Sequence, residues 1–403
     1  MRKIKEIYHQ LRRKLAKLWL DVNLQLTIVG VAGSYGKTTT TCAITKVLST
    51  QLSVNQTDIN LDTNFNLPIT ILKTKMWNEV LVLEYGIDHL GEMDNHLNLV
   101  RPKIAVLTGI TPVHAEKGLL NSIENIIAEK TKLVKAVPKD GLAIFNYDDV
   151  RVRKIGQDFK GNKIFYGTNP RADVWADQVK VTLGGTEFKI HDGKEDFLIK
   201  TGLLGCPAVY ACLTAYVVGK RQGIKPDKIL YALAGLKPLD GRLSIEPGPL
   251  QTILVNDVKR SNPASAVAGL KTLARLPGRK VAVLGEMGEL GNFAEKMHRE
   301  VGIQAAKLKI DILVGVGPLT RFMIEEAQKQ GMTNDQLFWT KDVKGTALVL
   351  KKVLKPKDLL YLKASLLRHL ERVVFLLENK KVICSETVCR HYASCATCSR
   401  LVK

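Results

Sequence analysis

The chain has 403 residues, of which 45% are hydrophobic and 25% charged, proportions that suit a globular protein of two or three domains. These proportions exclude a disordered chain. No apolar run approaches the roughly 20 residues that a membrane span needs. The net charge of +21 is spread along the chain without a nucleic-acid-binding motif, so we expect no nucleic-acid partner. Since no signal peptide is recognisable, we expect a cytoplasmic protein.

Residues 1–22 are predicted to form a basic amphipathic helix. Apolar residues recur at helical spacing from Ile4 to Trp19, and Lys and Arg fill the other positions. One interpretation is that residues 1–20 dock on an anionic membrane surface or on a partner. The other is that the apolar face covers a groove on the domain that follows. We favour the second, because many such helices complete a core.

Residues 23–241 are predicted to form an α/β domain. Short apolar runs typical of buried parallel strands alternate with helical segments. The strands are expected at Leu26–Val31, Val80–Leu83, Ile104–Leu107 and Leu142–Phe145, and the helices at Thr38–Leu48, Ser122–Val137, 207–222 and 226–235. This order predicts a doubly wound, mostly parallel sheet. Residues 160–200 carry glycine turns between alternating strands and predict an antiparallel appendage.

A second domain, Rossmann-like and covering residues 242–380, is predicted after a turn-rich hinge at Pro238–Arg242. Strands are expected at 252–256, 281–285, 311–315 and 358–362, with a weaker one near 337–340. Asn262 and Pro263 are typical of a helix start, since Asn caps well and Pro suits the first turn. No internal repeat is present in the sequence.

A phosphate-binding loop is the clearest motif of the chain. It follows an apolar strand and precedes a helix, the context in which backbone N–H groups cradle phosphates. Lys37 supplies a positive charge to the β and γ phosphates, and Thr38 offers a hydroxyl to Mg²⁺. The motif departs from the strict pattern at Val31, where its first glycine would stand. The predicted ATP-binding residues here are Gly33, Ser34, Tyr35, Gly36, Lys37, Thr38 and Thr39.

Two further side chains are predicted at the same edge of the sheet. Glu84 ends the strand Val80–Leu83, where a carboxylate is placed to bind Mg²⁺. His114 follows the strand Ile104–Leu107, and its position makes a metal role as plausible as a purely structural one.

These motifs, in their order along the chain, resemble the Mur ligase family of cell-wall synthesis. The resemblance spans about residues 25–378 and is closest to the branch that adds D-alanyl-D-alanine to a UDP-N-acetylmuramoyl-tripeptide. Its most specific stretch is Val281–Gly291, read as Val-Ala-Val-Leu-Gly-Glu-Met-Gly-Glu-Leu-Gly, followed by His298-Arg-Glu-Val-Gly302. The family's N-terminal UDP-binding domain has no counterpart before the first strand, so how the UDP group is held is left open.

The resemblance implies an ATP- and Mg²⁺-dependent ligase that forms an amide bond through an acyl phosphate. It implies that Lys37, Glu84, His114 and Lys130 are catalytic, and that Lys130 is carbamylated and joins Thr38, Glu84 and His114 around Mg²⁺. Arg242 and Asp257 correspond to nucleotide-contacting residues of the family. The implied substrates are a UDP-linked muramyl peptide and a D-amino-acid dipeptide.

Several family positions differ, and they keep two alternatives open. The two asparagines of an adenine-binding motif are replaced in Pro207–Ala211, and Leu366 stands where an arginine is usual. Asn64-Phe-Asn66 replaces a Glu-x-Gly motif. One alternative is another amide ligase of the same fold, of the folylpolyglutamate type. The other is a weakly catalytic nucleotide-binding scaffold.

The tail, residues 381–403, is rich in cysteine. Cys384, Cys389, Cys395 and Cys398 are candidate zinc ligands, because Zn²⁺ takes four soft ligands and Cys-x-x-Cys is a common half-site. Free thiols are the alternative.

Overall fold

The computed structural model describes residues 2–58, 63–389 and 394–401. The chain divides into two compact units, of which the first holds residues 1–179, 187–202 and 207–236. The second holds residues 180–186, 203–206 and 237–403. The main division therefore falls beside the turn-rich segment at Pro238.

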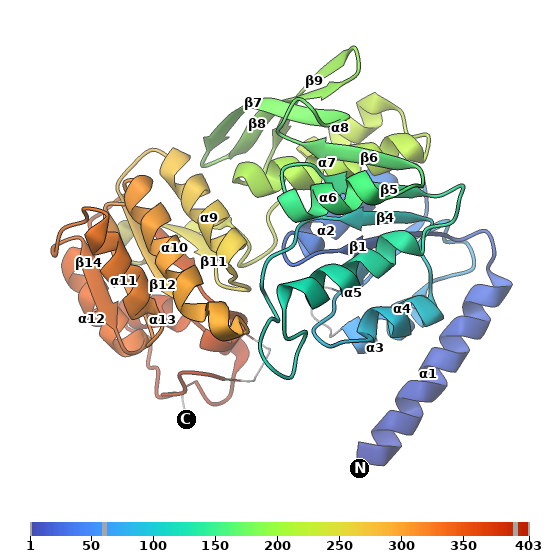
Figure 1. The fold of residues 1–403 in the computed structure, drawn as a ribbon. Helices are drawn as coiled ribbons and strands as arrows, with labels where there is room; N and C mark the ends of the chain where they lie inside the picture. The colour runs from blue at the N-terminus through green and yellow to red at the C-terminus, as the bar shows by residue number, and fades with distance from the viewer. Residues whose placement is uncertain (1, 59–62, 390–393, 402–403) are drawn as a thin grey trace. The chain divides into compact units, whose positions relative to one another are not determined.

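The first unit is built on a nine-stranded sheet with the order β2-β3-β1-β4-β5-β6-β7-β8-β9 (Figure 1). The strands are β1 Thr27–Ala32, β2 Val54–Gln56, β3 Val80–Tyr85, β4 Ile104–Leu107, β5 Leu142–Asn146, β6 Lys163–Gly167, β7 Val174–Thr182, β8 Gly185–Asp192 and β9 Glu195–Thr201. Strands β1 to β5 pair in parallel, and all except the edge strand β2 are almost entirely buried. Their apolar runs therefore need cover on both faces, which the helices provide.

The helices of the first unit pack in layers against this sheet. Helix α2 packs on α8, whereas α3, α4 and α5 pack side by side. The helices are α1 Arg2–Val22, α2 Lys37–Leu48, α3 Thr63–Lys73, α4 Glu92–Leu99, α5 Ile123–Lys135, α6 Val150–Asp158, α7 Gly205–Arg221 and α8 Pro226–Ala234. The parallel, doubly wound architecture predicted from the sequence is confirmed.

The segment 160–200 differs in part from the prediction. Strand β6 is parallel to β5, and β7 is parallel to β6, so this segment extends the main sheet instead of forming an appendage. Only β7, β8 and β9, joined by two-residue connections, have the hairpin character that the glycine turns predicted. Helix α6, which the sequence analysis did not identify, makes the crossover between β5 and β6 that parallel pairing requires.

Helix α1 forms as predicted, but its orientation contradicts the favoured interpretation. It packs on α3 with His9, whose ring lies 4.8 Å from that of Phe65, and with the fully buried Ala16. The guanidinium of Arg13 donates a hydrogen bond to the Asn95 carbonyl at 2.5 Å. Six apolar residues between Ile7 and Val22 are exposed and cover no groove, whereas Trp19 and Leu20 are half-buried. Because Ala16 is small, α1 can approach α3 closely on this face, whereas the larger side chains of the exposed apolar face would keep the two helices apart.

The second unit has a six-stranded sheet with the order β10-β11-β15-β12-β13-β14. Its strands are β10 Ser244–Pro247, β11 Ile253–Asp257, β12 Lys280–Gly285, β13 Ile312–Val316, β14 Leu337–Thr340 and β15 Leu359–Lys363. Strand β10 runs antiparallel to β11, and the other pairs are parallel. The Rossmann-like pattern is confirmed, including the weak strand near 337–340.

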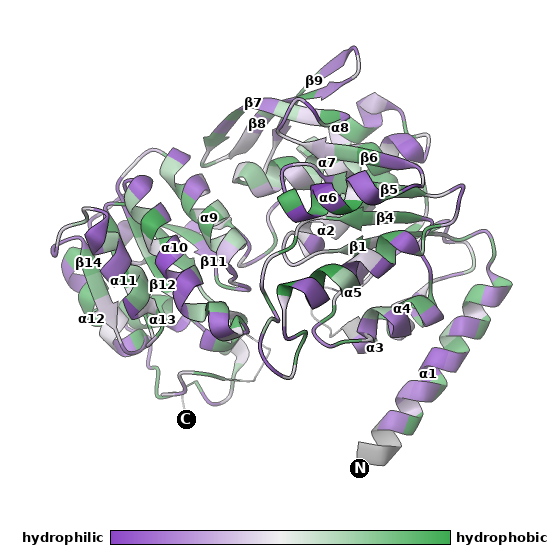
Figure 2. Ribbon diagram, in the orientation of Figure 1, coloured by the Kyte–Doolittle hydropathy of each residue, from purple (hydrophilic) through white to green (hydrophobic). Residues whose placement is uncertain are grey.

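Five α-helices and four short 3₁₀ turns complete the described part of this unit: α9 Pro263–Arg275, α10 Ala294–Lys307, α11 Thr320–Lys329, α12 Val343–Val353, α13 Arg372–Leu377, η1 Pro249–Gln251, η2 Gly291–Phe293, η3 Leu366–Arg368 and η4 Cys395–Thr397. Helix α9 begins as predicted, with Asn262 and Ser265 forming reciprocal capping hydrogen bonds. Hydrophobic residues concentrate on the strands and on the sheet-facing sides of the helices (Figure 2). No described helix is both long and apolar enough to span a bilayer.

Candidate functional site

The phosphate loop lies at the carboxyl end of β1, between the carboxyl ends of β3 and β4. Gly36 has the left-handed backbone (φ 77°) and immediately precedes α2, so its N–H and those of the first turn point out of the helix. Gly33 lies at φ 153°, and a Cβ there would lie 2.0 Å from Thr108 Oγ1. Glycine is therefore favoured at Gly36 by the left-handed backbone and at Gly33 also by the lack of room for a side chain against the β4 edge.

Lys37, Thr38 and Glu84 converge at this loop. The Lys37 Nζ donates to the Gly33 carbonyl at 3.0 Å and lies 3.9 Å from Glu84 Oε1. The Thr38 hydroxyl donates to Glu84 Oε2 at 2.9 Å. The parallel register sets Val31 opposite Glu84, so the two strands end together. The half-buried Thr39 follows in the first turn of α2.

Lys130 reaches the same loop from helix α5. Its Nζ lies 3.3 Å from the Gly33 carbonyl, and the residue is only 2% exposed. Burial, reinforced by the charge of Lys37, lowers the pKa of Lys130 to about 7. A large fraction of this amine is thus neutral near neutral pH, and the neutral amine is the form that reacts with CO₂ to give a carbamate. The prediction that Lys130 lies at the site rested on the resemblance alone, and the geometry fits it.

His114 lies near the loop, but none of the described hydrogen bonds joins its ring to Glu84. Its Nδ1 is 2.8 Å from the Ile87 carbonyl, which places the ring against the segment that follows β3. The residue has a left-handed backbone, with φ 68°, a conformation that is uncommon outside Gly but that His, like Asn and Asp, adopts more often than most residues. Its role as a metal ligand stays a prediction.

Two residues that the sequence analysis did not single out hold the loop in place. The Thr108 hydroxyl donates to the Tyr35 carbonyl at 2.5 Å. The Asp149 carboxylate accepts from the Tyr35 hydroxyl and from the Ile110 N–H, both at 3.0 Å. Ser34 is fixed by its N–H donating to the Gly109 carbonyl at 2.7 Å. The available signals were a polar residue directly after a buried strand for Thr108 and a helix-capping residue before α6 for Asp149.

An acidic group borders the site in the loop between β3 and α4. Asp88, His89 and Glu92 each offer one metal-ligating atom, and these atoms lie within 4.8 Å of one another. Glu92 accepts hydrogen bonds from the N–H groups of Asp88 and His89 at 2.8 and 3.0 Å and from the Asn64 amide at 2.7 Å. These bonds lower the pKa of Glu92 against the opposing effect of burial. Asn64, at a family glutamate position, thus has a local structural role.

Asp257, in the second unit, forms a buried ion pair with Lys363. Their strands are adjacent and in register, and Lys363 Nζ lies 2.6 Å from Asp257 Oδ2. The Tyr361 hydroxyl donates to the same oxygen at 3.1 Å. Burial raises the pKa of Asp257, and the charges of Lys363 and Arg242 oppose that rise. Arg242 and Asp257 therefore interact electrostatically, as two residues predicted to serve one nucleotide should.

The segment Gly285–Gly291 is held by Glu286 and His298. The Glu286 carboxylate pairs with Arg368 Nη2 at 2.6 Å and accepts from the Leu319 N–H at 2.9 Å. His298 Nε2 accepts from the Met287 N–H at 3.1 Å, and its Nδ1 lies 2.7 Å from the Ala294 carbonyl. The two bonds require a neutral ring, and burial lowers the pKa of His298 accordingly.

Comparison with known proteins identifies the family. The model of the Mur ligase middle domain matches residues 31–219, and that of the Mur ligase glutamate ligase domain matches residues 241–366. The chain is 31% identical over 364 residues to the UDP-N-acetylmuramoyl-tripeptide–D-alanyl-D-alanine ligase of Bacillus subtilis, covering 90% of this chain and 78% of the relative. The chain belongs to the Mur ligase family. It is accordingly an ATP-dependent, amide-forming ligase.

Solved Mur ligases share the fold. MurF from Acinetobacter baumannii superimposes with a TM-score of 0.84 at 23% identity, covering 92% of this chain and 81% of that one. MurF from Thermotoga maritima, solved in complex with ADP, gives 0.80 at 24% identity, covering 92% and 84%. At these identities the likeness establishes the fold alone.

The residues at the Mur ligase phosphate loop fit Mg²⁺. Thr38 Oγ1 and Glu84 Oε2 are 2.9 Å apart, close to the roughly 3 Å that separates neighbouring ligands in an octahedron with bonds of about 2.1 Å. A hydroxyl and a carboxylate are also the oxygen donors that this ion prefers.

One family feature is missing from this Mur ligase. Ala208 and Ala211 in α7 replace the two asparagines of the adenine-binding motif, and each is only 1% exposed. Neither side chain offers a polar group, so the adenine contact that the resemblance implies is not present at these two positions.

The four tail cysteines are not brought together as a single set. They are free thiols, and among the described residues no group of three metal-ligating side chains contains more than one of them. Cys395 instead joins His369 and Glu371. His391, a further soft ligand in the sequence, lies outside the described residues. Zinc ligation by all four cysteines stays a prediction.

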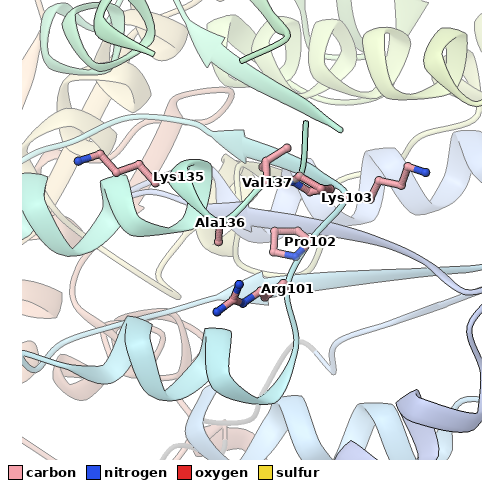
Figure 3. Close-up of a pocket in the computed structure, with 7 residues that line it drawn as sticks. Arg101, Pro102, Lys103, Lys135, Ala136 and Val137 are labelled. Carbon is pink, nitrogen blue, oxygen red and sulfur yellow. The ribbon is translucent and has the colours of Figure 1, made fainter. Parts of the chain in front are cut away.

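A cavity of about 400 Å³ lies away from this site (Figure 3). It is lined by Arg101–Lys103, which precede β4, and by Lys135–Pro138, which follow α5. It therefore opens at the amino end of β4, whereas the phosphate loop lies at the carboxyl ends of the strands. We assign it no part in the ligase reaction.

Proposed function

We propose that this Mur ligase joins D-alanyl-D-alanine to a UDP-N-acetylmuramoyl-tripeptide. The relatives that match most of the chain carry this activity in their names, and the signature at Gly285–Gly291 belongs to the same branch. The observation that carries the ligase chemistry is the convergence of Lys37, Thr38, Glu84 and Lys130 around the Gly33 carbonyl.

In the proposed reaction a substrate carboxylate attacks the γ phosphorus of ATP, the bond to the β–γ bridging oxygen breaks, and ADP leaves. The amine of the second substrate then attacks the acyl carbon, loses a proton, and expels phosphate as the amide forms. Lys37 stabilises the charge on the transferring phosphoryl group, and the loop N–H groups position it. Thr38, Glu84, carbamylated Lys130 and His114 are the proposed Mg²⁺ ligands, and the ion supplies further charge neutralisation. Arg242 and Asp257 are proposed to contact the nucleotide.

The test is phosphate release from Mg-ATP by the purified chain, with the muramyl tripeptide and D-alanyl-D-alanine added singly and together. We expect release only with both substrates. Lys37→Ala should abolish it, whereas Lys46→Ala, an exposed lysine on the same helix α2, should not. Release with a folate monoglutamate and glutamate instead would identify the folylpolyglutamate-type alternative. ATP binding without release under either condition would favour the scaffold.

A second proposal concerns α1, which we assign to docking on an anionic membrane surface from the cytoplasmic side. Its exposed apolar residues share one face of the helix, with exposed fractions between 46% and 69%: Ile7, Tyr8, Leu11, Leu15, Leu18 and Val22. Residues 1–22 contain seven Lys and Arg against one Glu and one Asp. Exposed Leu24 continues the apolar surface. Exposed Met76 and Trp77 lie near the start of β1, where the Thr27 N–H donates to the Glu79 carbonyl at 2.9 Å. Apolar residues flanked by cations suit a lipid interface.

Co-sedimentation with vesicles tests this proposal. The chain should bind phosphatidylglycerol–phosphatidylcholine vesicles, bind pure phosphatidylcholine much less, and be released by salt. Leu11→Glu and Leu15→Glu should reduce binding at least tenfold, whereas Leu348→Glu, an exposed leucine on α12 (64%), should not. Self-association that depends on Leu11, with no vesicle binding, would show that a second copy covers this face.

A further inference from the structure

We propose that His369, Glu371 and Cys395 form a zinc site in the second unit, with Cys398 as the fourth ligand. This site would join the C-terminal tail to the segment that follows β15. It is independent of the ligase reaction proposed above, and it differs from a site made of the four tail cysteines.

The three side chains already lie close together. One ligand atom from each is within 4.8 Å of those of the other two. The Nδ1 of His369 is 3.0 Å from Glu371 Oε1, and the Cys395 N–H donates to the same oxygen at 3.2 Å. Ligand atoms around tetrahedral Zn²⁺, with bonds of about 2.0–2.3 Å, are separated by roughly 3.3–3.8 Å. Small side-chain rotations are therefore enough to complete the ligand set.

The imidazole has unused bonding capacity in a buried place. His369 is 1% exposed, and its Nε2 is buried with no hydrogen-bond partner in the described structure. The nitrogen beside Glu371 is Nδ1, so the proposed zinc ligand is Nδ1, which would exchange its hydrogen bond with Glu371 for the metal. An imidazole, a carboxylate and a thiolate are each ligand types that Zn²⁺ takes in proteins.

Cys398 is placed to supply the fourth ligand. It packs in the same small cluster as Cys395, with Val382 and Leu401. Its N–H donates to the Cys395 carbonyl at 3.1 Å, so the Cys-x-x-Cys segment is already a turn. This spacing lets two thiolates of one turn ligate the same ion.

Cys384 and Cys389 have other surroundings. The Cys384 sulfur lies 3.5 Å from Arg372 Nη1, and the Cys389 N–H donates to the Leu367 carbonyl at 2.8 Å. Within the described residues neither belongs to a group of three metal-ligating side chains, and nor does Cys398, but Cys398 packs in the cluster of Cys395 and the other two do not. They are therefore matched controls on the same tail.

The experiment measures zinc in the full chain after purification without added metal, and again after loading and desalting. We expect about one zinc per chain, and Co²⁺ substitution should give the visible bands of a tetrahedral site together with thiolate charge transfer. Cys395→Ser, Cys398→Ser and His369→Asn should each lower zinc retention at least tenfold. Asn suits position 369 because it tolerates the left-handed backbone there (φ 47°). Cys384→Ser and Cys389→Ser should retain the metal.

Three results would overturn the proposal. The first is no zinc retention by the folded wild-type chain. The second is loss of zinc in Cys384→Ser and Cys389→Ser, which would restore the four-cysteine site. The third is retention in Cys395→Ser or His369→Asn. Far-UV circular dichroism and the unfolding temperature identify any variant that fails to fold. Limited proteolysis supplies a readout other than binding, since removal of zinc should expose the tail beyond residue 379 to cleavage.

Discussion

The hydroxyl of Thr38 donates a hydrogen bond to the carboxylate of Glu84 at 2.9 Å, joining the first turn of α2 to the end of β3. The two residues are 46 positions apart in sequence. Their contact follows from the parallel pairing of β1 and β3, which sets Val31 opposite Glu84. The two side chains proposed as Mg²⁺ ligands therefore lie next to each other.

Glu84→Gln should reduce the ligase rate by roughly 100-fold or more, because it removes a charged oxygen ligand while keeping the shape of the side chain. The measurement is phosphate release as a function of Mg²⁺ concentration. The variant should bind the metal more weakly and so need a higher Mg²⁺ concentration for half of its maximal rate. Glu79→Gln alters an exposed carboxylate just before the same strand and should have little effect. Equal effects of the two substitutions would argue against a metal role for Glu84.

Lys130 should make the ligase dependent on dissolved CO₂. Its pKa of about 7 keeps much of the amine neutral, so carbamylation is accessible under ordinary conditions. We expect activity to fall in CO₂-free buffer and to return on addition of bicarbonate, and ¹³C-bicarbonate to give a carbamate signal. Lys130→Arg should abolish activity, since a guanidinium stays protonated. Activity independent of bicarbonate would count against the carbamate.

Gly33→Ala should abolish nucleotide binding without unfolding the chain. The added Cβ would lie 2.0 Å from Thr108 Oγ1, so the loop must move away from the β4 edge. Equilibrium binding of a fluorescent ATP analogue measures the effect. Gly184→Ala is the matched control, because its Cβ would have Thr182 Oγ1 as its neighbour at 3.8 Å. Wild-type affinity of Gly33→Ala would refute the tight packing described for this loop.

Asp257→Asn should destabilise the second unit by about 3–5 kcal/mol, because it leaves the buried Lys363 ammonium without its anion. Thermal unfolding with a probe in this unit measures the change. The double variant Asp257→Asn with Lys363→Met should recover part of the loss, since the uncompensated charge is gone. Asp240→Asn breaks an exposed pair with Lys259 at 3.5 Å and should change stability by less than about 1 kcal/mol.

His298 should make stability fall in mild acid. Its folded-state pKa is lowered by burial, so the unfolded chain binds this proton more readily. Its contribution is therefore fully present above the unfolded pKa of about 6.5 and is lost as pH falls toward the folded pKa. The stability advantage of wild type over His298→Gln should shrink between about pH 7.5 and pH 5. A constant difference would exclude His298 as the titrating group.

The sequence by itself determined most of the buried parallel strands, the phosphate loop and the start of α9, but not β2 or β10. Buried parallel strands are continuous apolar runs, and the glycines, Lys37 and Thr38 act within one local turn. Because parallel strands end at one edge, the sequence also predicted that Glu84 would meet Thr38, which the structure bears out. These features depend on local geometry and on a topology that the alternation of strands and helices reveals.

Only the tertiary structure decided which distant side chains meet and which faces are covered. Lys130 lies 97 positions from Gly33 yet reaches its carbonyl, and Thr108 and Asp149 hold the loop through side-chain packing that no local pattern encodes. Helix α1 was identified by its periodicity, but packing on α3 left its apolar face exposed. Cys395 lies beside His369 and not within a set of four cysteines. The periodicity of a sequence shows which side chains share a helix face, whereas long-range packing determines what that face contacts.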